Sequence, residues 1–177
     1  MSEHVLVLGG ARSGKTAFGE DLAMRYGAKP AFLATAEALD QEMKDRIAAH
    51  QRSRARRFDD FEEPLDIGGT MLEAARHHDV ILVDCLTVWV SNLLGAERDV
   101  TEAVESLAMT LSRLDTARVI MVSNEVGLGI VPDNALARSY RDLMGWTHQR
   151  LAGVCSEVHF IIAGLPMTLK GLPIHSR

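Results

Sequence analysis

Several features that would point to other classes of protein are scarce or missing in this sequence. It has only two cysteines, Cys85 and Cys155, which are too few for a disulfide framework. Both lie in apolar surroundings, so we expect buried, unreactive thiols. No apolar run approaches the roughly 20 residues that span a bilayer, and no basic region precedes an apolar segment at the N-terminus. We therefore expect no membrane anchor, no signal peptide and a cytoplasmic location.

The sequence also lacks an excess of basic residues. It has 19 lysines and arginines against 24 aspartates and glutamates, which gives a formal net charge of −5. Proteins whose main partner is nucleic acid usually present a basic face, so we expect no nucleic-acid partner. A length of 177 residues with 47% hydrophobic content suits a single soluble domain, which we expect to span residues 1–177.

What the sequence does contain is a phosphate-binding motif near its N-terminus. The stretch VLVLGGARSGKT, residues 5–16, runs from four apolar residues through a glycine turn into a helix start, and Gly9, Gly14, Lys15 and Thr16 fit the pattern G-x-x-x-x-G-K-[ST]. Glycines let backbone N–H groups surround an anion, and the helix adds the positive end of its dipole. Lys15 can reach the β- and γ-phosphates, and the Thr16 hydroxyl can bind Mg²⁺. The motif predicts a nucleotide phosphate site.

The rest of the chain alternates apolar runs with helical patterns. After the strand that precedes the P-loop, we expect strands at residues 30–34, 80–84, 119–122 and 158–163. We expect helices at residues 15–26, 38–57, 70–77, 86–94, 100–114 and 134–154, with a break at residues 62–64. Buried strands that alternate with helices are typical of a mainly parallel sheet covered on both faces. The sequence therefore predicts a P-loop α/β fold.

In such sheets, ligands collect at the carboxyl ends of the strands. We expect that edge to gather the P-loop, Thr35, Asp84 and residues 123–125. Asp84 follows four apolar residues, so it can assist Mg²⁺ as a Walker B carboxylate or cap the following helix, and the presence of the P-loop favours the metal role. Residues 123–125 can contact substrate or only cap the next element.

A basic segment at residues 46–57 leaves several interpretations open. Arg46, His50 and Arg54 are spaced by four and share one face of a helix. That face can simply be solvated, as most charge runs are, or it can handle phosphate with His50 as a nucleophile. His50 can also act as a general base. Glu62, further along, can hold ribose or metal, although composition favours plain exposure.

Five segments together resemble one known family. They are GGARSGKT at 9–16, LATAEALDQEMKDRIAAH at 33–50, EEP at 62–64, VDCLTVWVSNLL at 83–94 and SNEVGLGIVPDNALARSYRD at 123–142. They resemble the bifunctional adenosylcobinamide kinase/adenosylcobinamide-phosphate guanylyltransferases of cobalamin biosynthesis. The segments span nearly the whole chain, and the last is far more specific than a P-loop.

The resemblance implies a RecA-like sheet, a homotrimer and two reactions in one site. ATP or GTP, with Mg²⁺, would phosphorylate the aminopropanol hydroxyl of adenosylcobinamide. GMP would then pass from GTP to that phosphate through a GMP-histidine, releasing pyrophosphate and giving adenosylcobinamide-GDP. The histidine of the family's R-I-x-x-H segment falls on His50, which favours the nucleophile among the roles left open above.

The same resemblance implies a set of nucleotide contacts. They fall on Gly9, Gly10, Ala11, Arg12, Ser13, Gly14, Lys15, Thr16, Ala34, Thr35, Ala36, Gln51, Arg52, Ser53, Arg54, Glu62 and Asp84. Thr16 and Asp84 are also the residues expected to hold the metal. One departure is His148, where the family tends to have asparagine.

Other functions stay open on the sequence alone. Some relatives are expected to keep only the transferase activity. A plain P-loop small-molecule kinase would use His50 as a base or not at all. A nucleotide-switched binding module is disfavoured, because the sequence has no N-K-x-D motif to recognise guanine.

Overall fold

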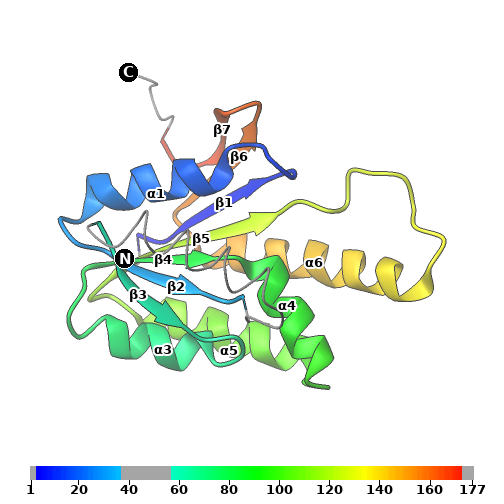
Figure 1. Cartoon of the computed structure of the whole chain (residues 1–177), viewed down its shortest axis with the longest axis horizontal. Helices are drawn as coiled ribbons and strands as arrows, with labels where there is room; N and C mark the ends of the chain where they lie inside the picture. The colour runs from blue at the N-terminus through cyan, green and yellow to red at the C-terminus, as the bar shows by residue number, and fades with distance from the viewer. Residues whose placement is uncertain (1–2, 37–56, 173–177) are drawn as a thin grey trace, which may run out of the picture.

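The computed structural model describes residues 3–36 and 57–172 of the chain. Its described strands form a seven-stranded sheet in the order β3-β2-β4-β5-β1-β6-β7 (Figure 1). Neighbouring strands run parallel except for the antiparallel pair of β6 and β7. The strands are β1 (Val5–Gly9), β2 (Ala31–Ala34), β3 (Asp59–Glu62), β4 (Val80–Asp84), β5 (Arg118–Asn124), β6 (Glu157–Ile162) and β7 (Leu165–Lys170).

Helices cover both faces of this sheet. They are α1 (Lys15–Tyr26), α3 (Ile67–Ala74), α4 (Leu86–Gly95), α5 (Val100–Arg113) and α6 (Ala135–Val154). Figure 1 shows α1 on one face and α3 and α5 on the opposite face. None of these described helices is long and apolar enough to cross a membrane.

The core explains why the inner strands have continuous apolar sequences. Successive β1 residues point to opposite faces, so Val5 and Val7 join the apolar cluster under α1 while Leu6 and Leu8 join the cluster on the other face. A strand buried on both faces needs apolar residues at every position. The predicted mainly parallel α/β sheet is confirmed.

Three elements differ from the sequence prediction. Strand β3 occupies residues 59–62, between the expected helix end at residue 57 and the expected break at 62–64; we expected no strand there because the sequence DDFE is polar. Helix α3 begins at Ile67 rather than residue 70, since Asp66 caps it by accepting a hydrogen bond from Gly69 N at 3.0 Å. Strand β7 was not expected, because a proline usually argues against a strand, although an edge strand tolerates Pro166. The helix predicted at residues 38–57 lies almost wholly outside the described residues.

The two cysteines behave as the sequence predicted. Both are free and buried. Burial raises the pKa of the Cys155 thiol to about 12, although the positive charge of Lys170 acts in the opposite direction. A thiol with so high a pKa is rarely a thiolate, so Cys155 is expected to be inert.

Candidate functional site

The P-loop connects β1 to α1 at the carboxyl end of the sheet. Gly14, just before α1, has φ 93°, a left-handed conformation that favours glycine. At Gly9, a Cβ atom would lie 2.5 Å from Ser13 Oγ and 2.8 Å from the Ile161 carbonyl oxygen. The backbone conformation thus requires a glycine at one end of the motif, and close packing requires one at the other.

Lys15 is the first residue of α1 and turns back toward the loop. It is only 8% exposed, and its Nζ donates to the Gly10 carbonyl at 3.2 Å. The ammonium group is thus held against the loop itself, next to Gly10, as expected of a lysine that can reach a phosphate bound by the loop. The first turn of α1 contains no acidic residue. The positive end of the helix dipole is therefore available to an anion.

Thr35 joins the ends of β2 and β4. Its N–H donates to the Asp84 carbonyl at 3.1 Å, and its Oγ1 donates to the Cys85 carbonyl at 2.8 Å and accepts from Cys85 N at 2.9 Å. Asn92 Nδ2 donates to the Thr35 carbonyl at 2.7 Å. The buried Thr35 hydroxyl is thus engaged within the protein, where it fixes the backbone that carries Asp84.

Thr16 and Asp84 supply the oxygen donors that a hard divalent cation prefers. Thr16 lies in the first turn of α1, and Asp84 ends β4, which is separated from β1 only by β5. Within residues 3–36 and 57–172, no three His, Cys, Asp or Glu side chains gather where they could hold a metal. One hydroxyl and one carboxylate instead suit a cation that takes its other ligands from nucleotide phosphates and water.

The other expected nucleotide contacts fall into two groups. The strand register places Ala34 between Glu62 on β3 and Asp84 on β4, and Ala36 follows two residues later. These residues share the carboxyl edge of the sheet with the P-loop. The second group, Gln51, Arg52, Ser53 and Arg54, lies outside the described residues, as does the expected catalytic residue His50.

The end of β5 lies directly beside the P-loop. Glu125 N donates to the Gly9 carbonyl at 3.0 Å, and Asn124 Nδ2 donates to Thr87 Oγ1 at 3.0 Å. The Glu125 carboxylate then accepts hydrogen bonds from Gly127 N at 2.7 Å and Leu128 N at 3.1 Å. The structure therefore brings residues 123–125, Thr35, Asp84 and the P-loop to one edge, and Glu125 holds the turn that follows β5.

Two cavities open beside this part of the P-loop. The first, of about 630 Å³, is lined by Gly10, Ala11, Arg12, Ser13, Glu125, Val126, Leu128, Gly129, Phe160, Ile161, Ile162 and Ala163. The second, of about 390 Å³, is lined by Ala11, Thr87, Val88, Ser91, Asn124, Glu125, Val126 and Tyr140. Sequence reasoning missed residues 160–163, because the end of an apolar strand carries no chemical pattern that marks a binding site.

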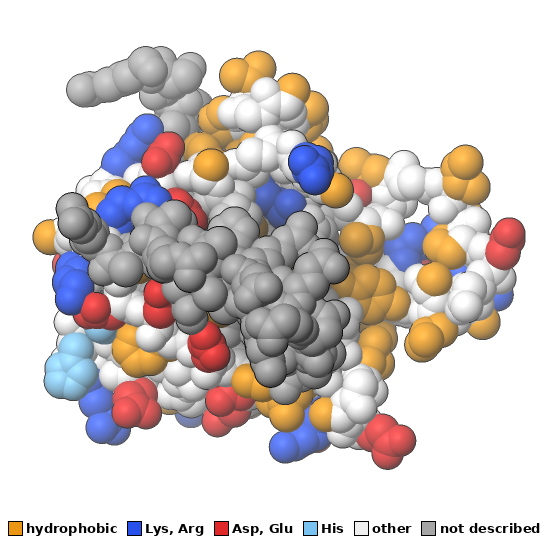
Figure 2. Space-filling view, in the orientation of Figure 1, with side chains coloured by type: hydrophobic (Ala, Val, Ile, Leu, Met, Phe, Trp, Pro, Cys, Tyr) orange, Lys and Arg blue, Asp and Glu red, His pale blue; other side chains and the backbone are white. Residues whose placement is uncertain are grey.

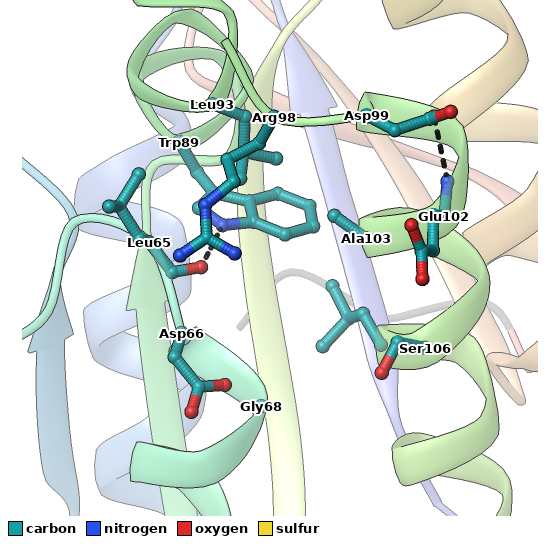
Figure 3. Close-up of a pocket in the computed structure, with 11 residues that line it drawn as sticks. Leu65, Asp66, Gly68, Trp89, Leu93, Arg98, Asp99, Glu102, Ala103 and Ser106 are labelled. Atoms are coloured by element: carbon teal, nitrogen blue, oxygen red, sulfur yellow. Dashed lines mark hydrogen bonds between the residues drawn. The ribbon is translucent and has the colours of Figure 1, made fainter. Parts of the chain in front are cut away.

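A third cavity, of about 360 Å³, lies between α3, α4 and α5 (Figure 3). Its Trp89 Nε1 donates to the Leu65 carbonyl at 2.8 Å, and Asp99 caps α5 by accepting from Glu102 N at 3.1 Å. The lining has three carboxylates and a single arginine, Arg98. That balance of charge disfavours a triphosphate in this cavity.

The fold and this site define a P-loop nucleotide-binding α/β protein. Solved structures agree on the fold. A protein from Pyrococcus horikoshii OT3 has a TM-score of 0.51 at 12% identity, covering 97% of this chain and 87% of that one. An ATPase from the type III secretion system of pathogenic bacteria has a TM-score of 0.53 at 12% identity, covering 94% and 56%. At such low identity, the likeness shows the fold alone.

Sequence comparison identifies the family. The family model described as cobinamide kinase / cobinamide phosphate guanyltransferase matches residues 5–169. The bifunctional adenosylcobalamin biosynthesis protein CobP of Pseudomonas aeruginosa is 45% identical over 171 residues, 96% of this chain and 98% of that protein. The corresponding CobU proteins of Escherichia coli and Salmonella typhimurium are 33% and 35% identical, each over 94% of this chain and 99% of its own.

The chain belongs to the cobinamide kinase / cobinamide phosphate guanyltransferase family. It is accordingly an enzyme with kinase and guanylyltransferase activities, which confirms the family and the enzyme class predicted from the sequence.

Proposed function

We propose that this enzyme phosphorylates adenosylcobinamide with ATP or GTP and then transfers GMP from GTP to adenosylcobinamide phosphate, producing adenosylcobinamide-GDP and pyrophosphate. The observation that carries the proposal is the P-loop with Lys15 turned toward Gly10, next to two cavities that an acceptor can enter. The kinase step needs the γ-phosphate beside the acceptor, and the transfer step needs the α-phosphate exposed. One triphosphate site can serve both steps.

The proposed divalent cation is Mg²⁺, bound by the Thr16 hydroxyl and the Asp84 carboxylate together with phosphate oxygens. When bound, such an ion neutralises charge on the β- and γ-phosphates. Lys15 adds a second positive charge there, and the N–H groups of residues 9–14 surround the phosphates. Ala34, Ala36 and Glu62 share that edge of the sheet and are proposed to contact the nucleoside.

GMP transfer is proposed to proceed through His50. A nitrogen of its neutral imidazole attacks the α-phosphorus, so that an N–P bond forms while the bond to pyrophosphate breaks. A phosphate oxygen of the acceptor then attacks the same phosphorus and the N–P bond breaks. Arg46 and Arg54, each four residues from His50, can stabilise the charge on the α-phosphate.

We also propose that the chain is a single domain that assembles as a homotrimer. The loop after β5 and the first turn of α6 project from the body, and hydrophobic side chains gather there (Figure 2). Ile130 is 98% exposed, and Val131 and Leu136 are exposed beside it. Strand β7 exposes a second apolar row that includes Leu165 and Met167. Two different apolar surfaces on one chain suit a heterologous contact that closes a ring.

Mass spectrometry of the protein after incubation with GTP and Mg²⁺, without any corrinoid, tests the transferase chemistry. We expect a GMP adduct on the peptide that contains His50, absent in His50→Ala and retained in His77→Ala, which changes an exposed histidine. An adduct that persists in His50→Ala would refute the nucleophile. If the wild-type protein binds nucleotide but forms no adduct, the result would favour a kinase without transferase activity. Native mass spectrometry of the same sample tests the trimer, whose mass should be three times 19.4 kDa.

A further inference from the structure

We propose that Glu125 is the general base of the kinase step, and that the hydroxyl-bearing arm of the acceptor enters the cavity between the P-loop and the loop after β5. The proposal rests on the kinase activity above and assigns a residue to it. The acceptor is an alcohol, so its oxygen becomes a good nucleophile only when a positioned group accepts its proton.

The position of Glu125 follows from the backbone. Its N–H donates to the Gly9 carbonyl at 3.0 Å, which fixes it next to the first glycine of the P-loop. Lys15 Nζ donates to the carbonyl of the next residue, Gly10, at 3.2 Å, and a P-loop lysine is expected to contact the γ-phosphate. Ala11, Glu125 and Val126 line both cavities that open there. An acceptor in either cavity would therefore have both the P-loop and Glu125 in the wall around it.

The residues that line the two cavities also point to Glu125 as the base. Glu125 is the one carboxylate among the described residues that line these two cavities. Gly127 N donates to its Oε1 at 2.7 Å and Leu128 N donates to its Oε2 at 3.1 Å. These bonds orient the carboxylate, and each oxygen keeps a lone pair that can accept a further proton.

The larger cavity also suits the body of the acceptor. Leu128, Phe160 and Ile162 form apolar walls, and Leu128 and Ile162 are exposed toward solvent. A corrin macrocycle presents apolar methyl groups and ring edges, so these walls can bind it while its flexible arm reaches the P-loop. Burial of such apolar surface contributes to binding without any charge.

The proton balance distinguishes the two reactions of the enzyme. In the kinase step, the acceptor oxygen bonds to the γ-phosphorus, the bond from that phosphorus to the β-phosphate oxygen breaks, and the hydroxyl proton passes to Glu125. In the transfer step, the attacking group is already a phosphate anion and releases no proton. Glu125 is therefore needed as a base in the first reaction only.

Glu125→Gln provides the test, because it keeps the shape and one accepting oxygen but removes the base. We expect kcat for cobinamide phosphorylation to fall by about 100-fold or more. GMP transfer to preformed cobinamide phosphate, assayed on the same sample, should stay within about threefold. Glu73→Gln, on the exposed side of α3 and remote from both cavities, is the matched control and should change neither rate.

A role of Glu125 as a loop cap alone would produce a different result. Unchanged phosphorylation, or an equal fall in both activities, would overturn the proposal. If the glutamine variant unfolds, Glu125→Ala is assayed with added formate, which should restore phosphorylation by about tenfold if a carboxylate is the missing base. Absence of rescue would also overturn it. Wild-type protein that forms the GMP adduct without phosphorylating cobinamide would refute the proposed kinase function itself.

Discussion

Ser123 Oγ and His148 Nε2 lie 2.7 Å apart, and both side chains are buried, so that this hydrogen bond joins α6 to β5. Burial lowers the pKa of His148 from 6.5 to about 4, although the negative charge of Glu125 acts in the opposite direction. The imidazole is therefore neutral near pH 7 and bonded to the strand two residues before Glu125. The pair anchors the second half of α6 to the strand whose end adjoins the P-loop.

The low pKa of His148 predicts that acid destabilises the protein. Between about pH 6.5 and pH 4, this histidine is protonated in the unfolded chain but remains neutral in the folded protein. The unfolded state is therefore stabilised relative to the folded state as the pH falls. From about pH 7.5 to about pH 5, His148 alone should lower the free energy of unfolding by about 2 kcal/mol. Urea unfolding at the two pH values measures this change.

The matched variants separate His148 from the other histidines. The asparagine of His148→Asn can keep a hydrogen bond to Ser123 but cannot titrate. The free energy of unfolding of this variant should therefore fall by about 2 kcal/mol less than that of wild type between about pH 7.5 and about pH 5. His77→Asn changes an exposed histidine and should behave like wild type. His4 is also buried, with a pKa lowered by burial, so part of the pH dependence persists in both variants. A wild-type slope in His148→Asn would contradict the assignment.

Lys15→Met should strongly reduce both activities together. The variant keeps approximately the length of the side chain but removes the ammonium that is proposed to contact the β- and γ-phosphates. We expect GTP affinity and both rates to fall by about 100-fold or more, measured by isothermal titration and the two assays. Lys29→Met is the control, because Lys29 is exposed and its ion pair with Asp59, at 2.7 Å, lies on the surface. Full GMP transfer in Lys15→Met would show that the P-loop serves only the kinase step.

Two glycine substitutions should shift stability in opposite directions. In α1, a Cβ at Gly19 would lie 2.9 Å from Val122 Cγ2 and 3.2 Å from Leu82 Cδ1. Gly19→Ala should therefore cost about 1–3 kcal/mol through overpacking against the sheet. In α6, a Cβ at Gly145 would meet no described atom within 4 Å, so Gly145→Ala should gain up to about 1 kcal/mol. Thermal unfolding of both variants measures these changes in stability. A Gly19→Ala variant as stable as wild type would contradict the close packing of α1 against the sheet.

The inner strands of the fold could be predicted because burial on both faces leaves an unbroken apolar run, as in VILV before Asp84. The two edge strands, β3 and β7, could not be predicted in the same way. Residues 59–62 are polar and residues 165–170 contain a proline, since each edge strand has a neighbour on one side only and half of its residues can face solvent. Their place depends on the strand beside them rather than on their own sequence.

Local sequence is enough to predict the P-loop, because its backbone geometry depends on a few residues that are close together in the chain. The family and its two activities could also be predicted, because short segments of distinctive sequence identify them. The surroundings of the P-loop do not follow in this way. Glu125 adjoins Gly9, and residues 160–163 line the same cavity as Gly10, only because β5 and β6 flank β1 in the sheet. The burial that keeps His148 neutral likewise comes from the packing of α6 against α4 and α5. Contacts between distant segments depend on sheet order, which no local pattern encodes.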